Sequence, residues 1–419
     1  MLASLLTVGA VRPVIADPVP GPDGLLPEPG MSMQGLYGPY GMTRESSGTS
    51  WQPESADMEG LHRMAGPWTT MAAGQLSGIY THQGGARGGD QAFNESMAMV
   101  MARRALDDGA IGLRAMASLE PLMGPRGYPL LFQTGETANG IDPLVDRQHP
   151  HNLLLEVAAS YSRTLGPNSS LFIYGGPIAE PALGPPAFMH RFSSEDNPEA
   201  PISHHWIDST HVAFGVVTAG AVRGVWKMEA SAFNGREPDQ HRYGVQFRGF
   251  DSGSVRLSFN PNEHWALQAS AGRLASPEQL EPSVAVRRTT ISAIHDDRLG
   301  DAHWQATIAV GRNTPTGRST TTAAIADATV HFGERRSVFM RYERAEKDEL
   351  FSAGTEPALP TPAISKLSLG YVVDIVTVGH VAIGLGGVVS AHWIPADLVP
   401  AYGERPSSYT LFLRAKLVR

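Results

Sequence analysis

Residues 146–165 read DRQHPHNLLLEVAASYSRTL, and residues 166–220 continue with GPNSSLFIYGGPIAE, PALGPPAFMHRFSSEDNPEAPISHH and WIDSTHVAFGVVTAG. Two apolar segments with alternating side chains lie here between long polar loops, and a tight LGPN turn joins them. Connections in soluble domains usually run about 4–6 residues, so such long loops are uncommon there. A transmembrane β-barrel has short turns at one end and long loops at the other. The stretch therefore predicts a membrane barrel.

The same pattern continues from Trp68 to the end of the chain. It predicts an all-β fold, an antiparallel transmembrane β-barrel of about sixteen strands. Short turns follow every second strand, among them LDDG, AVRG and TVG, and longer polar loops follow nearly all the others. The strands are expected at residues 67–82, 92–105, 109–120, 151–164, 168–178, 206–220, 223–235, 249–260, 263–275, 284–296, 301–312, 319–332, 335–347, 364–376, 378–393 and 407–418.

The two faces of the expected strands differ in polarity. In segment 223–235, Trp226 and Met228 share one face, whereas Lys227 and Glu229 share the other. A soluble barrel would turn the apolar face inward, so alternation alone leaves both kinds of barrel open. Tryptophans just after short turns favour the membrane barrel, where they would form an aromatic girdle, although they could instead pack in a core. These tryptophans are Trp68, Trp226, Trp265 and Trp304.

Composition narrows the range of functions. The chain has 419 residues, a net charge of −8 and no cysteine. A negative net charge gives no reason to expect nucleic acid as a partner. The absence of cysteine excludes disulfides, thiolate zinc sites and cysteine nucleophiles, and it is compatible with an oxidising compartment.

Three regions are expected along the chain. Residues 1–16 resemble the apolar core and cleavage end of a truncated secretory signal peptide, although they could be an ordinary apolar N-terminus. Residues 17–65 are rich in proline, glycine and methionine and are expected to form a mobile tail. Residues 66–419 form the expected barrel, which would lie in the outer membrane of a Gram-negative bacterium.

Several sequence motifs carry a resemblance to a known group of proteins. They are GYPLLFQTGETANGIDPLVDRQHPHNL (127–153), IAEPALGPPAFMHR (178–191), DNPEAPISHHWIDSTHVAFGVVTAG (196–220) and FNGREPDQHR (233–242). With these motifs the chain resembles an uncharacterised family of porin-like outer-membrane β-barrels of Gram-negative bacteria, some of which are encoded near heavy-metal resistance genes. The resemblance implies a fold and a location, and it implies no established activity.

Histidines gather in the loops around the opening stretch. Imidazole suits copper, zinc and nickel, and two or more converging rings would make a metal site. The alternative is that these rings order the loops through hydrogen bonds to carboxylates, because their spacing matches no fixed ligand motif. Copper or zinc is therefore an optional ligand of the chain and no cofactor is required. The candidate metal ligands are His149, His151, His190, His204, His205 and His211.

The expected tail offers a second, softer set of ligands. Thioether and imidazole together suit Cu(I). The alternative is a polar tail without a ligand. The residues concerned are Met31, Met33, Met42, Met58, His62 and Met64.

A hydrolase is a less favoured interpretation of the sequence. Asp208, Ser209 and His211 are the residue types of a catalytic triad. On an extended strand, however, Ser209 and His211 would lie roughly 6–7 Å apart and Asp208 would face the other way. The chain is therefore not expected to be an enzyme.

The sequence favours a porin-like channel for passive passage of small solutes or ions. Outer-membrane lipid is expected around the barrel, and an oligomeric state is compatible with this function. Charges of both signs on the lumen face would orient solutes, or they would neutralise one another in a plugged barrel. A copper- or zinc-binding barrel linked to metal resistance is the alternative. The expected pore-lining residues are Arg114, Glu120, Glu156, Lys227, Glu229, Arg256, Arg341 and Glu343, with Arg414 and Lys416 beside them.

Overall fold

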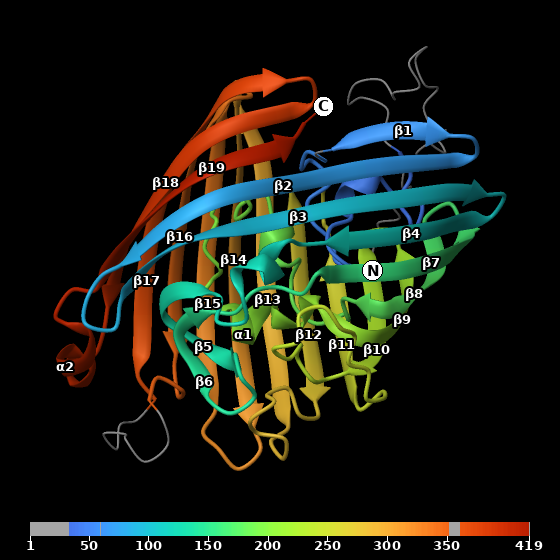
Figure 1. Ribbon diagram of the computed structural model, residues 1–419. Helices are drawn as coiled ribbons and strands as arrows, with labels where there is room; N and C mark the ends of the chain where they lie inside the picture. Colours follow the sequence, from blue (N-terminus) through green and yellow to red (C-terminus); the bar gives the residue numbers. More distant parts are fainter. Residues whose placement is uncertain (1–32, 59, 352–360, 419) are drawn as a thin grey trace, which may run out of the picture.

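A computed structural model describes residues 33–58, 60–351 and 361–418. In this part of the chain sixteen antiparallel strands close into a barrel, which confirms the predicted fold (Figure 1). The predicted signal segment, residues 1–16, lies outside the described residues. No helix among the described residues is long and apolar enough to cross a membrane.

Each of the sixteen predicted segments overlaps one strand of the barrel wall. The wall strands are β2 (Trp68–Gln83), β3 (Gly89–Leu106), β4 (Gly109–Ala117), β7 (Leu154–Gly166), β8 (Ser169–Ala179), β9 (Ala213–Arg223), β10 (Trp226–Asn234), β11 (Ser252–Phe259), β12 (Trp265–Leu274), β13 (Val286–Leu299), β14 (Ala302–Pro315), β15 (Thr321–Phe332), β16 (Arg336–Glu346), β17 (Ala363–Val378), β18 (Val381–Trp393) and β19 (Ser407–Leu417).

Each wall strand pairs with the next one along the chain, except that β4 pairs with β7. The ring closes where β19 pairs with β2, with Lys416 opposite Gln75. A short strand, β1 (Leu61–Ala65), pairs with the first residues of β2, beyond the point where β19 ends. Two residues join β3 to β4, whereas residues 118–153 join β4 to β7. This alternation of short and long connections is the one that the sequence indicates.

Side chains on the two faces of the wall differ as they do in a membrane barrel. On β11, Val255 and Leu257 face outward and are 49% and 44% exposed, whereas Arg256 and Ser258 face inward and are buried. Trp226, at the first residue of β10, also projects outward and stacks on Phe259 at 4.1 Å. An apolar outer face around a polar interior requires a bilayer outside. The barrel therefore lies in an outer membrane, as predicted.

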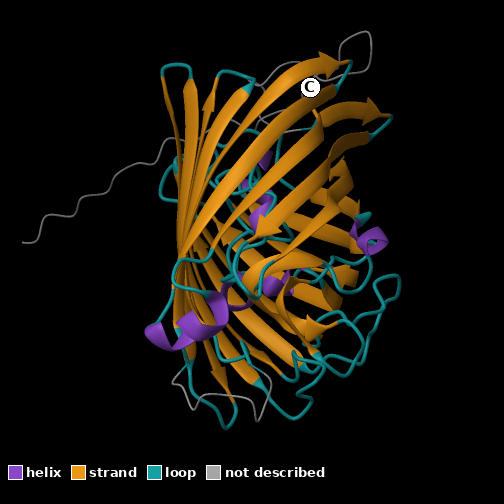
Figure 2. Cartoon of the chain, turned by 60° about the vertical axis from the view of Figure 1, so that its left-hand side comes forward, coloured by secondary structure: helices purple, strands orange, loops and turns teal. Residues whose placement is uncertain are grey.

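Three segments fill the inside of the barrel, and we call them together the lumen plug: residues 33–58, 118–153 and 180–212. Figure 2 shows loops and short helices enclosed by the strands. The plug contains η1 (Met42–Arg44), η2 (Glu120–Met123), β5 (Tyr128–Thr137), β6 (Pro143–Gln148), η3 (Phe188–His190), α1 (His204–Ile207) and η4 (Ser209–His211). Outside the plug, the β18–β19 loop carries η5 (Ala396–Leu398) and α2 (Val399–Tyr402).

Residues 33–58 of the predicted mobile tail are packed inside the barrel, with Tyr37 fully buried, whereas residues 61–65 form β1 beside the wall. The backbone carbonyls of residues 33–58 satisfy cations on the wall. Arg114 donates to Gly48 O at 2.5 Å, and Lys227 donates to Thr49 O. A buried cation needs acceptors, and the inserted chain supplies them. The composition of residues 33–58 predicts a mobile tail, but contacts with the wall of the lumen hold this segment in a defined position.

Three predicted strands differ from the structure at the ends nearest the plug. The segment expected at 206–220 forms a strand only from Ala213, and most of residues 204–211 form the short helices α1 and η4. The segment expected at 109–120 ends as a strand at Ala117, and Glu120 begins η2. The segment expected at 151–164 begins as a strand only at Leu154. In each place the chain passes between the wall and the lumen, so its side chains no longer alternate between two faces.

Arg191 fastens the plug to the wall. Its guanidinium donates to Asp208 of the plug at 2.7 Å and to Asp327 of β15 at 3.1 Å, and both pairs are fully buried. Arg341 of β16 donates to the same Asp327 at 2.7 Å. These pairs link the β8–β9 loop to the opposite side of the barrel.

Replacing Arg191 by alanine should loosen the plug. The change leaves Asp208 and Asp327 without a shared cation, and breaking a buried pair typically costs about 3–5 kcal/mol. We expect a broad-specificity protease to cut within residues 180–212, while the barrel keeps the heat-dependent gel mobility of a folded wall. The matched control is Arg163→Ala, whose exposed pair with Asp108 is worth less than about 1 kcal/mol. Equal resistance of the two variants to the protease would contradict the role given to Arg191.

Candidate metal centre

Five histidines of the lumen plug converge on one place inside the barrel. Their rings form a chain of neighbours, from His151 to His211 at 5.2 Å between centroids and on to His204 at 5.1 Å. His205 follows at 5.5 Å from His204, and His149 lies 6.1 Å from His205. A cavity of about 20 Å³ lies among them, which is room for one ion or one water. We call these five residues the histidine cluster.

The histidine cluster brings together five of the six predicted metal ligands. The sixth, His190, lies on η3 and lines a different cavity. His149 and His151 come from the end of the β4–β7 loop, and the other three come from α1 and η4 in the β8–β9 loop. Residues that are distant in sequence therefore meet because both loops fold into the same lumen. Whether they bind a metal stays a prediction.

Three of these rings are oriented through their Nδ1 atoms. His151 Nδ1 lies 2.9 Å from Glu120 Oε1, and His204 Nδ1 lies 2.7 Å from Asp208 Oδ1. His211 Nδ1 lies 2.8 Å from the backbone carbonyl of Asp208. Carboxylates and carbonyls only accept, so each Nδ1 carries the proton and, in a neutral ring, leaves Nε2 as a free base. Metal-binding histidines are held in the same way.

The Nε2 atoms of His151 and His211 face each other at 3.1 Å. Two neutral rings with protons on Nδ1 would place two lone pairs against one another, which is unfavourable. Either a proton or a cation between the two nitrogens removes this conflict. Two Zn–N bonds of about 2.0–2.1 Å at a tetrahedral angle would span roughly 3.3 Å. The spacing therefore suits two ligands of one metal ion.

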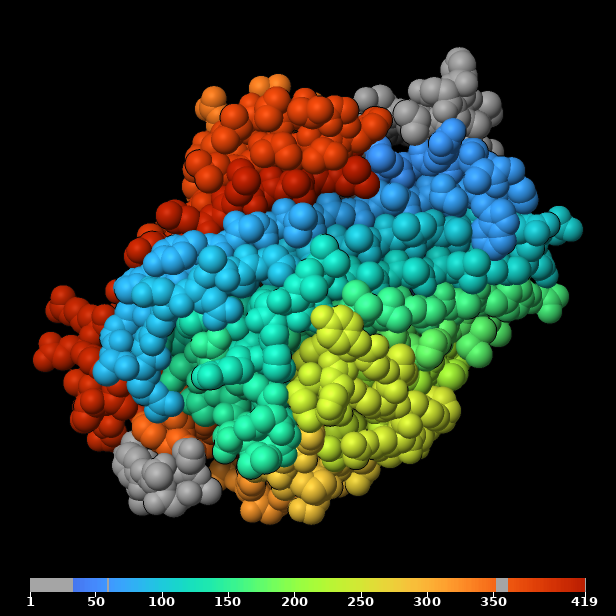
Figure 3. All heavy atoms as spheres, in the orientation of Figure 1, coloured from blue at the N-terminus to red at the C-terminus, as the bar shows by residue number. Residues whose placement is uncertain are grey.

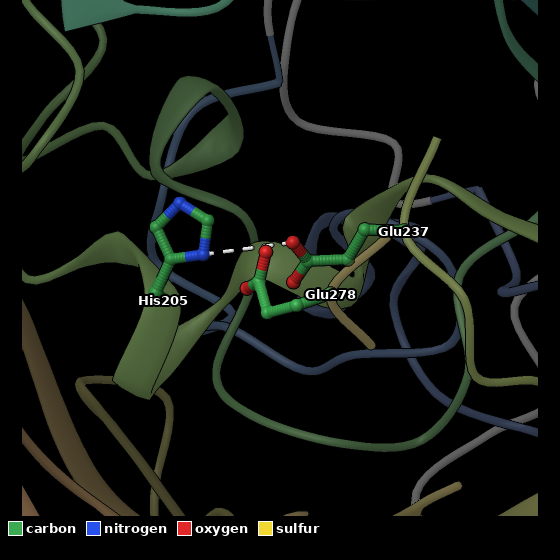
Figure 4. A group of neighbouring side chains, drawn as sticks. All are labelled: His205, Glu237 and Glu278. Atoms are coloured by element: carbon green, nitrogen blue, oxygen red, sulfur yellow. Dashed lines mark ion pairs between the residues drawn. The ribbon is translucent and has the colours of Figure 1, made fainter. Parts of the chain in front are cut away.

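A second group of ligand atoms adjoins the cluster. His205, Glu237 and Glu278 point toward one another, and one ligand atom of each lies within 4.8 Å of the others (Figure 4). His205 Nδ1 is 3.6 Å from Glu237 Oε2. The other ring nitrogen of His205, Nε2, is buried without a hydrogen-bond partner among the described residues. One imidazole and two carboxylates form a ligand set for a borderline cation such as zinc.

Burial sets the protonation of the cluster. Burial lowers the pKa of His149 and of His211 well below the ordinary value, and neighbouring cations and rings add to the effect. The pKa of His204 is also lowered by burial, although Asp208 partly offsets it. At His151, burial would lower the pKa, but the charge and hydrogen bond of Glu120 outweigh burial and raise it. Most of the rings are therefore neutral at neutral pH, as metal binding requires.

Two carboxylates of the site have raised pKa values. Burial raises the pKa of Glu136 to about 7, with Arg242 partly offsetting the rise. Burial and then the charge of Glu237 raise the pKa of Glu278 well above its ordinary value. Like charges held together in this way would be relieved by a bound cation in place of a proton.

Backbone strain accompanies the placement of Glu136. Phe132, Glu136 and Asp146 of the β5–β6 hairpin all have positive φ, between 54° and 65°. Such conformations cost about 1–3 kcal/mol each and persist only where the surroundings fix them. Asp146 is fixed by accepting from Phe132 N at 2.8 Å, and Glu136 by an ion pair with Arg242. Figure 3 shows the two loops concerned, the β4–β7 loop in teal and the β10–β11 loop in yellow-green, packed side by side.

All eight predicted pore-lining residues are buried, seven on the inner face of the wall and Glu120 on η2. They contact one another, the plug and, in the case of Arg341, Asp327 of β15. Arg341, for example, donates to Glu199 O at 2.6 Å. Their role as a pore lining stays a prediction. The remaining contacts are Arg114 to Glu156 at 3.3 Å, Lys227 to Glu229 at 3.5 Å, Arg256 to Glu229 at 3.0 Å, and Ser203 to Glu343 at 2.8 Å. Arg414 and Lys416 pair with Asp196 and Glu195.

Ser209 belongs to a different set of contacts from a catalytic triad. Its hydroxyl donates to Glu237 at 2.9 Å and accepts from Arg288 at 2.8 Å. His211 turns its Nδ1 to the Asp208 carbonyl and its Nε2 to His151. The sequence argument assumed a strand at these positions, and the helical turns replace that geometry with these contacts.

The sequence reasoning missed the acidic part of the site. Glu136 and Glu237 stand in the quoted motifs GETANG and FNGREPDQHR, but nothing in those motifs shows that two loops meet. Glu278 comes from the β12–β13 loop, which carried no motif. Only the folded lumen brings these residues together.

Comparisons with known proteins agree with the fold. No family model and no curated protein matches the sequence. OmpF of Salmonella typhi, in its complex with daunomycin, is similar in structure with a TM-score of 0.53 and 8% identity, covering 85% of this chain and 100% of that chain. OprB of Pseudomonas putida gives 0.51 and 9%, covering 83% and 94%. At this identity the likeness shows the fold of an outer-membrane porin barrel, and the uncharacterised family named above stays a prediction.

Acid should open the plug. In the open form the cluster histidines regain an ordinary pKa of 6.5, whereas three of them have a lowered pKa when folded. These three histidines therefore contribute their full stabilisation above pH 6.5, and that contribution is lost as pH falls below it, because the open form takes up protons that the folded form resists. His151 opposes this trend because its pKa is raised, and the raised pKa values of Glu136 and Glu278 oppose it as well. Protease cleavage of the plug in metal-free protein should increase from pH 8 to pH 5.

A substitution separates this effect from general acid sensitivity. His211→Asn keeps a donor for the Asp208 carbonyl and has no titrating group, so the opening should move to lower pH. His241→Asn is the control, because that side chain is 73% exposed. Cleavage that is the same at pH 5 and pH 8 would contradict the burial of neutral histidines.

Proposed function

We propose that this chain is an outer-membrane barrel that binds a divalent transition-metal ion, zinc or copper(II), inside its lumen. The observation that carries the proposal is the approach of His151 Nε2 to His211 Nε2 at 3.1 Å, with each Nδ1 held by an acceptor. His204 and the His205–Glu237–Glu278 group lie within reach of the same ion or a neighbouring one. Imidazole and carboxylate suit both ions.

The proposed role is capture of metal ions at the cell surface. The loops that form the histidine cluster leave the wall at the end with long connections, which in outer-membrane barrels faces the exterior. We propose metal ligands at this site and no activated nucleophile. We therefore propose no enzymatic activity for the chain. We propose in addition that the chain takes part in heavy-metal resistance and that it forms an oligomer.

A passive porin-like channel is the second candidate, and the porin fold favours it. The inward charges that would line such a channel are covered by the plug, and Lys227 and Glu343 have no exposed surface. Single-channel conductance in a planar bilayer distinguishes the candidates. An open channel conducts without added metal and is indifferent to histidine substitution, whereas a plugged metal-binding barrel conducts weakly until the plug is loosened by Arg191→Ala.

Calorimetry with zinc on the folded full-length chain tests the metal site. The unmodified protein should bind zinc, and the double variant His151→Ala, His211→Ala should bind it at least tenfold more weakly, because two ligands are lost. The exposed His241→Ala variant should leave binding unchanged. Heat-dependent gel mobility shows that each variant is folded. If the double variant binds zinc as tightly as the parent, the rings serve only to order the loops.

A further inference from the structure

A second cavity, of about 150 Å³, lies inside the barrel, and its lining contains many methionines together with charged and polar side chains. Seven of the fifteen methionines of the chain line it, and they come from three separate parts of the fold. We call it the methionine cavity. Its lining methionines are Met42 and Met58 of the N-terminal segment, Met71 of β2, Met97, Met99 and Met101 of β3, and Met189 of η3.

The wall strands place four of these thioethers in register. Met97, Met99 and Met101 alternate along β3 on its inward face, and Met71 on β2 lies directly opposite Met101. Figure 1 shows β2 and β3 side by side along the wall. Cross-strand partners have Cβ atoms about 4.5–5.5 Å apart, and methionine side chains are flexible enough for their sulfur atoms to converge.

The methionines share this lining with charged side chains such as Glu45, Glu95 and Arg114. The inward faces of β11 and β14, by comparison, carry no methionine. Methionine is flexible enough to fill irregular gaps, yet here the side chains surround a space instead of closing it.

His190 adds a nitrogen ligand to the same cavity. Its Nε2 is buried and has no hydrogen-bond partner among the described residues. Burial, with Arg114 and His151 nearby, lowers its pKa to about 4, so the ring is a neutral base at physiological pH. Residues of η3 contact both the histidine cluster and the methionine cavity. Phe188 packs on the rings of His151, His204 and His211 at 5.5–6.3 Å and also lines the methionine cavity, so its ring lies between the two.

We propose that the methionine cavity binds a soft monovalent cation, with Cu(I) as the ion and Ag(I) as its redox-inert substitute. Several thioethers with one neutral imidazole form a soft ligand set that suits Cu(I) and disfavours hard cations. The binding set draws on Met71, Met97, Met99, Met101 and His190. This site is separate from the histidine cluster, and it stands whether or not that cluster binds zinc.

Competition with a coloured Cu(I) chelator, under reducing and oxygen-free conditions, tests the site on the folded full-length chain. The parent should take one Cu(I) from the chelator. Met97→Leu with Met99→Leu keeps the volume of the side chains and removes two sulfur atoms, so affinity should fall at least tenfold. Met228→Leu is the matched control, because that methionine is 66% exposed on the outer face. Calorimetry with Ag(I) should give the same order of affinities, with the parent and Met228→Leu binding more tightly than Met97→Leu, Met99→Leu.

Two further measurements decide the outcome. The variant His151→Ala, His211→Ala should bind Cu(I) like the parent, and loss of Cu(I) binding there would overturn the separation of the two sites. X-ray absorption of the Cu(I)-loaded parent needs no variant, and it should show sulfur in the first coordination shell. A first shell of nitrogen and oxygen alone, or unchanged affinity in a folded Met97→Leu, Met99→Leu variant, would overturn the proposal.

Discussion

The structure depends on one constraint: polar groups that face into a barrel must be paired once a plug excludes water from them. An isolated buried charge is far more costly than a paired one. The wall strands present Arg114, Lys227 and Arg256 to the interior, and the carbonyls and side chains of residues 48 and 49 meet all three. On the opposite side, Lys366 and Thr410 bind Glu199 of the plug at 2.7 and 2.6 Å. The wall and the plug therefore specify each other.

The same constraint produces the histidine cluster. Burial lowers the pKa of His149, His204 and His211, and the acceptors that orient His151 and His211 leave their Nε2 atoms directed at one another. A proton and a metal ion are alternative occupants of the position between His151 Nε2 and His211 Nε2. A bound cation would relieve this conflict, which is why we propose the cluster as a metal site, and the strained β5–β6 hairpin positions Glu136 beside it.

The wall could be predicted from the sequence because its signals are local. Turns such as LGPN and the alternation of Trp226 and Met228 with Lys227 and Glu229 depend only on near neighbours. The plug could not, because residues 33–58 have the composition of a loose tail and owe their order to distant partners on the wall. The histidines were recognised by their residue type, whereas Glu136 and Glu237 became part of the site only through the folding of separate loops. The methionines of β3 did carry a signal, three thioethers at alternate positions, which the sequence reasoning did not use.

Anomalous diffraction would locate a metal ion in the histidine cluster. Crystals of the full-length chain grown with zinc would be measured above and below the zinc absorption edge. We expect an anomalous peak between His151 and His211, about 2.0–2.1 Å from both Nε2 atoms. A lumen without a peak, or zinc bound only at exposed histidines such as His241, would contradict this expectation.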